Sequence, residues 1–146
     1  HDALPIWSAK NLVLEPELDK ITWYGNQELT SHIWSNLIDN AIKFTPAGGE
    51  ITIKASMDEE WLTVSVQDSG IGIPPDIQSR VFDKFYQGDT SHKKKGNGLG
   101  LALVHQIVTL YGGHITLESI PDLGSTFTVC LPAHPSSEQE PSLPLP

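Results

Sequence analysis

A short stretch with two glycines, residues 68–74, constrains the fold of this chain more than any other feature. Residues 61–67 before it alternate bulky apolar with polar side chains, which is the period of a half-buried strand. Asp68 should therefore stand at the end of a strand. Gly70 and Gly72 permit positive φ and let a flat ligand approach the backbone without meeting a Cβ. The stretch therefore predicts a strand that opens into a tight turn at a binding crevice.

The chemistry of this turn has two interpretations. A carboxylate at the mouth of a crevice suits a neutral hydrogen-bond donor, such as the exocyclic amine of adenine. An ordinary junction of strand, turn and helix explains the same residues, because turn chemistry accounts for each of them and Pro74 and Pro75 suit the first turn of a helix.

Length and charge limit the classes of function. The 146 residues fit one domain with a core of ordinary size. Nine Lys and Arg against eighteen Asp and Glu disfavour a nucleic-acid or anionic-membrane surface, which needs a basic patch. Positive charge gathers at Lys84 and residues 93–95. This cluster indicates either a site for a small polyanion or a solvated charged loop.

Cys130 is the single cysteine, so no disulfide framework is possible and a reducing compartment is expected. The sequence has no apolar run long enough to cross a bilayer and no signal peptide. We therefore expect a cytoplasmic location, including as the cytoplasmic part of a membrane-bound protein, with no direct membrane contact.

Apolar residues recur at helical spacing over residues 29–44 and predict a helix that packs on a sheet. Asn26 or Thr30 would cap its N-terminus, and the segment 46–49 would end it. Its apolar stripe consists of Leu29, Ile33, Leu37, Ala41 and Phe44.

Two amides lie beside this stripe. In a helical projection Asn36 and Asn40 are neighbours, Lys43 adjoins them, and Asp39 falls further round, on the surface. An unpaired buried amide costs roughly 1–3 kcal/mol, so both amides need partners. Phosphate oxygens and a hydrated cation would supply those partners, and so would loop backbone.

A second helix that packs on the sheet is predicted at residues 101–110, with Tyr111-Gly-Gly113 as its end. Glycines at 96–100 come directly before it and would let phosphates approach the free N–H groups of its first turn. The Lys-Ser/Thr that follows the last glycine of a P-loop is absent. The apolar residues of this helix are Leu99, Leu103, Ile107 and Leu110.

The remaining elements follow from period-2 alternation and turn signals. A short helix is predicted at 76–82, and an aromatic cluster of Phe82, Phe85 and Tyr86 would anchor the polar loop 87–97, which we expect to be mobile without ligand. Strands are predicted at residues 11–18, 21–24, 50–57, 61–67, 114–120 and 125–131.

Four segments in series resemble the N, G1, F and G2 boxes of sensor histidine kinases: residues 36–44, 68–74, 81–86 and 96–101. The resemblance implies the Bergerat ATP-binding fold of the GHKL superfamily, also called the HATPase fold. This is an α/β architecture, an α+β two-layer sandwich whose mixed, mostly antiparallel sheet has about three helices packed on one face.

The resemblance also implies residue roles. Asp68 would bind the adenine amine, with Gly70 and Gly72 shaping the base pocket, and Asn36 and Asn40 would hold Mg²⁺ and phosphate oxygens. Asn36, Asn40 and Lys43 would be the catalytic residues. The other nucleotide-binding positions would be Phe44, Ile73, Lys84, Phe85, Gly96, Gly98, Leu99 and Gly100.

By the same resemblance, the chain would transfer the γ-phosphoryl group of ATP to a histidine on a separate dimerisation and phosphoacceptor domain, and indirectly supply a response regulator. No histidine here has the context of an acceptor. The resemblance divides the chain into a linker remnant (1–10), the ATP-binding domain (11–132) and a disordered tail (133–146), whose Pro, Ser and Glu content is typical of disorder.

Two alternatives remain open. A GHKL ATPase would carry a water-activating Glu four residues before the Mg²⁺-binding Asn, where this chain has Asn36, whose amide is no base. A nucleotide-binding or docking module without transfer activity is the other alternative, because Lys84 and Gln87 stand where many sensor kinases carry arginines.

Overall fold

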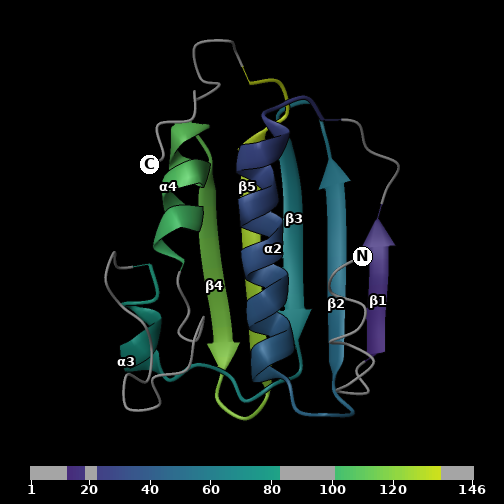
Figure 1. Cartoon of the computed structure of the whole chain (residues 1–146), viewed down its shortest axis with the longest axis vertical. Coiled ribbons are helices and arrows are strands. Elements are labelled where there is room, and N and C mark those ends of the chain that lie inside the picture. Colours follow the sequence, from purple (N-terminus) through teal and green to yellow (C-terminus); the bar gives the residue numbers. More distant parts are fainter. Residues whose placement is uncertain (1–12, 19–22, 83–100, 136–146) are drawn as a thin grey trace.

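The computed structural model describes residues 13–18, 23–82 and 101–135. They form one layer of sheet and one layer of helices (Figure 1). The helices are α2 (Gln27–Phe44), α3 (Pro75–Gln78) and α4 (Ala102–Leu110). The strands are β1 (Val13–Leu18), β2 (Glu50–Met57), β3 (Trp61–Asp68), β4 (His114–Ile120) and β5 (Gly124–Pro132).

The five strands form a single sheet in the order β1-β2-β3-β5-β4. β1 pairs with β2 in parallel, and the other three pairings are antiparallel. Helices α2 and α4 run along the same face of this sheet (Figure 1). The predicted mixed, mostly antiparallel sheet with helices on one face is confirmed.

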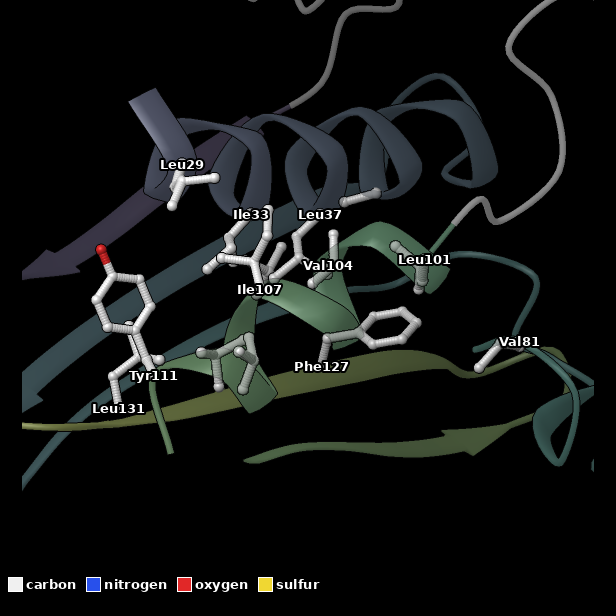
Figure 2. Close-up of a cluster of buried hydrophobic side chains, with 14 of the residues drawn as sticks. Leu29, Ile33, Leu37, Val81, Leu101, Val104, Ile107, Tyr111, Phe127 and Leu131 are labelled. Atoms are coloured by element: carbon white, nitrogen blue, oxygen red, sulfur yellow. The ribbon is translucent and has the colours of Figure 1, made fainter. Parts of the chain in front are cut away.

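The core lies between the two long helices and the sheet. Alternate residues of β5 point into it, including Phe127, Val129 and Leu131, as the period of a strand requires. Figure 2 shows Ile33 and Leu37 of α2 directed toward Val104 and Ile107 of α4. Burial of this shared apolar stripe sets the two helices against the sheet.

Both long helices have ends that the sequence specifies. The Asn26 side chain accepts a hydrogen bond from the Leu29 N–H at 2.9 Å, so Asn26 is the N-cap of α2, one of the two caps predicted. Helix α4 ends with Gly112 at φ 82° and with hydrogen bonds from Gly112 to Thr109 and from Gly113 to Val108. This pair of bonds is the Schellman arrangement.

The two helix ends also contact each other. The Tyr111 side chain, fully buried after the last turn of α4, accepts a hydrogen bond from the Asn26 backbone N–H at 2.8 Å. Trp23 packs edge-on against Tyr111 and donates from its indole N–H to the Pro132 carbonyl at 2.9 Å. The start of α2, the end of α4 and the end of β5 are therefore joined.

Several predicted boundaries were wrong. Trp23 and Tyr24 are not in a strand, and residues 19–22 lie outside the described part. Helix α3 ends at Gln78, well before the predicted Phe82. Leu110, assigned to the packed stripe of α4, is 42% exposed. Ile107 of the predicted stripe is buried, as expected, and Leu103 is partly buried, but the other fully buried residues of α4 are Val104 and Val108, which the predicted stripe did not include.

In the described residues no helix combines the length and apolar character that a membrane span requires.

Replacing Tyr111 by Phe should destabilise the protein by about 1 kcal/mol, because the Asn26 N–H loses its acceptor while the aromatic packing is kept. Urea unfolding followed by tryptophan fluorescence measures this change. An unaltered free energy of unfolding would contradict the assigned role of the hydroxyl group.

Candidate functional site

Segments far apart in the sequence meet at the end of the sheet where β3 and β4 finish, the lower end in Figure 1. A Cβ added at Gly70 would collide with the carbonyl of Phe44, the last residue of α2. A Cβ at Gly124, the first residue of β5, would collide with the carbonyl of Asp68. The turn after β3 is therefore packed directly on the backbone of α2 and β5.

Asp68 is the last residue of β3, as predicted. It shares the helix-covered face with Leu62 and Val66 and is only 7% exposed. Burial raises the pKa of its carboxyl group above the usual value, while hydrogen bonds from the N–H groups of Gly70 and Ser125 act in the opposite direction. A buried carboxylate at the end of a strand is suited to accept a hydrogen bond from a neutral donor.

The space beside Gly70 and Gly72 is filled by protein backbone, which the sequence did not predict. Gly72 has φ 76°, the positive value predicted for the turn. The Cβ that each glycine lacks would meet protein backbone, at Phe44 for Gly70 and at Ile120 and Pro121 for Gly72. The protein's own chain therefore occupies the side on which each glycine lacks a Cβ, so a flat ligand would have to approach these residues from another side. The glycines allow the turn to pack closely.

The residues predicted to hold phosphate and a cation share one stretch of α2. Asn40 is buried at 6% exposure, Asn36 is half-buried, and Lys43 is exposed. The Asn36 Nδ2 atom donates to the His32 carbonyl at 2.7 Å. Because this bond turns the nitrogen toward the helix backbone, Oδ1 is the Asn36 atom suited to a hard cation. Asp39 is exposed, as predicted.

The end of α2 is hydrogen-bonded to the turn that follows Asp68. The Ile71 N–H donates to the Phe44 carbonyl at 3.2 Å. Asn40 lies about one helical turn before Phe44, so roughly 6 Å along the axis separates them. The structure therefore brings the Asp68 turn and the amide-bearing end of α2 to the same face and the same end of the sheet.

Other predicted positions are only partly described. Lys84, Phe85, Gly96, Gly98, Leu99 and Gly100 lie outside the described residues. The Phe82 ring packs 5.5 Å from the His105 ring on α4 and 6.4 Å from the Phe127 ring on β5, measured between centroids. The described part of the aromatic cluster thus joins the core. Ile73 is also core, at 7% exposure.

Sequence reasoning missed several residues that hold this end of the sheet together. Ser69 accepts from the Glu50 N–H at 2.8 Å and donates its own N–H to the Glu50 carbonyl at 3.0 Å. Gln78 and Ser119 bond the turn in a similar way. Serines on strands and in turns look like ordinary surface positions, so no sequence signal marked them.

The expected boundary of the domain at residue 132 falls just before one further residue that packs on the fold. Ala133 is buried and donates its N–H to the Glu60 carbonyl at 2.9 Å. In the described ranges, no group of three or more His, Cys, Asp or Glu side chains is placed to hold a metal ion.

Residues 25–135 match the family model described as histidine kinase-, DNA gyrase B- and HSP90-like ATPase. The chain is 47% identical over 124 residues to the circadian input-output histidine kinase CikA of Thermosynechococcus vestitus, covering 84% of this chain and 17% of that protein. It is 38% identical over 135 residues to the sensor histidine kinase WalK of Bacillus subtilis, covering 90% of this chain and 21% of that protein. The chain thus spans about a fifth of the length of these relatives.

Solved structures give the same result. The catalytic domain of the histidine kinase ThkA, in a nucleotide-free form, superimposes with a TM-score of 0.79 at 26% identity, covering 91% of this chain and 88% of that one. Full-length ShkA in complex with AMPPNP has a TM-score of 0.77 at 27% identity, covering 94% of this chain and 29% of that one.

The raised pKa of Asp68 predicts how stability depends on pH. Just above the usual value of 3.8 the native carboxyl group holds its proton more tightly than the unfolded one, so stability falls as pH rises through this window. The variant Asp68→Asn should lack this contribution to the pH dependence of the unfolding free energy. The stability of the variant minus that of the wild type should therefore be larger at pH 7 than at pH 3. Urea unfolding at both pH values measures this difference. A difference in unfolding free energy that is equal at both values would contradict the prediction.

Proposed function

The chain belongs to the family of histidine kinase-, DNA gyrase B- and HSP90-like ATPases, and we propose that it is the catalytic and ATP-binding domain of a two-component sensor histidine kinase. The resemblance read from the four boxes is thereby confirmed at the level of the family. The nucleotide chemistry, the partners and the location belong to this proposal.

Asp68 recognises the base in this proposal. The support is its place at the end of β3, its 7% exposure and its bond to Gly70 at 2.9 Å, which fixes one carboxylate oxygen. The adenine amine is a neutral donor that supplies a further bond to the carboxylate. A base without a donor at that position would leave the buried carboxylate without this partner, so the site would select adenine.

Asn36, Asn40 and Lys43 face the phosphates. Amide oxygens are hard ligands that suit Mg²⁺, which retains waters and shares phosphate oxygens. The bond from Asn36 Nδ2 to His32 is consistent with Oδ1 as the cation-facing atom. Bound Mg²⁺ would neutralise charge on the phosphate oxygens. The exposed Lys43 supplies positive charge one turn from Asn40.

The proposed reaction moves the γ-phosphoryl group from ATP to a ring nitrogen of a histidine on a separate dimerisation domain. The P–O bond to ADP breaks and a P–N bond forms, and the phosphohistidine would then supply a response regulator. Such transfer needs positioning and charge neutralisation rather than covalent help from the protein. A cytoplasmic location is part of the same proposal.

One observation carries the proposal. The turn after Asp68 is hydrogen-bonded to the last residue of α2, so the base-binding carboxylate and the amides lie at one end of one face. The water-activating ATPase is disfavoured, because Asn36 replaces the general base and its amide nitrogen is bonded to the helix backbone.

Loss of the Asp68 charge should weaken ATP and ADP binding by about tenfold to a hundredfold, which is the worth of a hydrogen bond to a charged group. Calorimetric titration of Asp68→Asn measures this change. Asp39→Asn, an exposed carboxylate on α2, is the matched control and should bind as the wild type does. Equal affinity in wild type and Asp68→Asn would remove Asp68 from the adenine role.

Phosphoryl transfer is tested by mixing the chain with radiolabelled ATP and a separately made histidine-containing dimerisation domain. Acid-labile, base-stable label should appear on the acceptor, and Asn36→Ala should reduce its rate by at least about tenfold, which corresponds to ~1.4 kcal/mol of lost stabilisation. Label released only as inorganic phosphate would instead support an ATPase.

A further inference from the structure

Both backbone polar groups of Ile73, in the turn that follows Asp68, are bonded by side chains. The Ile73 N–H donates to Ser119 Oγ at 2.7 Å, and the Ile73 carbonyl accepts from Gln78 Nε2 at 2.7 Å. Ser119 comes from the end of β4 and Gln78 from α3. The turn is thus held by two elements that carry none of the predicted nucleotide contacts.

Ser119 and Gln78 are also hydrogen-bonded to each other, and Ser119 is hydrogen-bonded to β5. Gln78 Nε2 donates to the Ser119 carbonyl at 3.2 Å. The Ser119 hydroxyl lies 3.0 Å from the Gly124 carbonyl, to which it can donate, and 2.9 Å from the Ser125 hydroxyl. Since Gly124 packs on the Asp68 carbonyl, this network of hydrogen bonds extends to the residue proposed to bind the base.

The other bonds of this turn go to different elements. Ser69 pairs with Glu50 of β2, and the Ile71 carbonyl accepts from the Asp122 N–H at 2.7 Å. Of the hydrogen-bonded residues in this turn, Ile73 is the furthest along the chain from Asp68. It is 7% exposed, so leaving its N–H group without an acceptor would be costly. Removing the side chain of Ser119 or of Gln78 should therefore let the turn open locally at Ile73.

We propose that Ser119 and Gln78 are positioning residues for nucleotide binding, which hold Ile73 so that the turn from Asp68 to Gly72 keeps its binding shape without ligand. This inference rests on the proposed function. A site that is already in its bound shape avoids the free-energy cost of ordering. If the competent turn is populated only one tenth of the time, the apparent Kd rises about tenfold.

The test compares the Kd for ADP of the 146-residue chain in wild type, Ser119→Ala, Gln78→Met and the double variant. Each single variant should raise Kd about tenfold by the population argument. The double variant should be little worse than either single one, because both act through Ile73. Ser119→Thr keeps the hydroxyl group and should restore affinity.

Tyr111→Phe is the matched control. It also removes an acceptor from a backbone N–H, but at the opposite end of α2 (Figure 1). It should lower stability without raising Kd, which separates positioning from general destabilisation. Hydrogen exchange without nucleotide adds a second measurement: the Ile73 amide should exchange faster in Ser119→Ala, while β3 and β5 amides should not.

The outcomes distinguish this inference from the proposed function. Wild-type affinity in both Ser119→Ala and Gln78→Met, with Asp68→Asn still impaired, would overturn the positioning role alone. A rise in Kd for Tyr111→Phe equal to that of Ser119→Ala would also overturn it. Failure of the wild type itself to bind ADP would overturn both the inference and the proposed function.

Discussion

The contact between the turn after β3 and the end of α2 is the constraint on which the rest of the structure depends. Gly70 lies so close to the Phe44 carbonyl that no side chain fits there, and Ile71 donates to that carbonyl at 3.2 Å. Because this bond joins backbone to backbone, it fixes the helix end relative to the strand end whatever side chains surround it. The amides of α2 and the carboxylate of β3 owe their common location to this contact.

Asp68 shows a conflict between stability and binding. A carboxylate buried at 7% exposure has a raised pKa, which means that the folded state disfavours the charge. The fold offsets this cost only partly, through the N–H groups of Gly70 and Ser125. Under the proposed function the ligand adds a further donor to this carboxylate, which accounts for a destabilising charge at this position, and costly groups commonly gather at functional sites.

The helices and strands were largely predictable because their signals are local. Leu29, Ile33 and Leu37 recur at helical spacing, and Asn26 caps the helix they define, so α2 was predicted nearly to its ends. The prediction of which residues are buried failed where burial depends on the packing of neighbouring elements. Leu110 is apolar and in a helix but exposed, because the orientation of α4 depends on how it packs against α2 and β5. The sequence could not indicate that orientation.

The sequence by itself determined the period of the long helices and the strands, the position of Asp68 at a strand end and the family to which the chain belongs, because each of these depends on residue types at fixed spacing. Only the tertiary structure showed which atoms lie beside Gly70 and Gly72, since both glycines face backbone that is distant in the sequence. It also decided the roles proposed for Ser119, which is bonded to Ile73 across 46 residues of sequence, and for Gln78, which is bonded to Ser119 across 41 residues. Hydrogen bonds across such separations exist only after the strands have taken their register, so no local pattern encodes them.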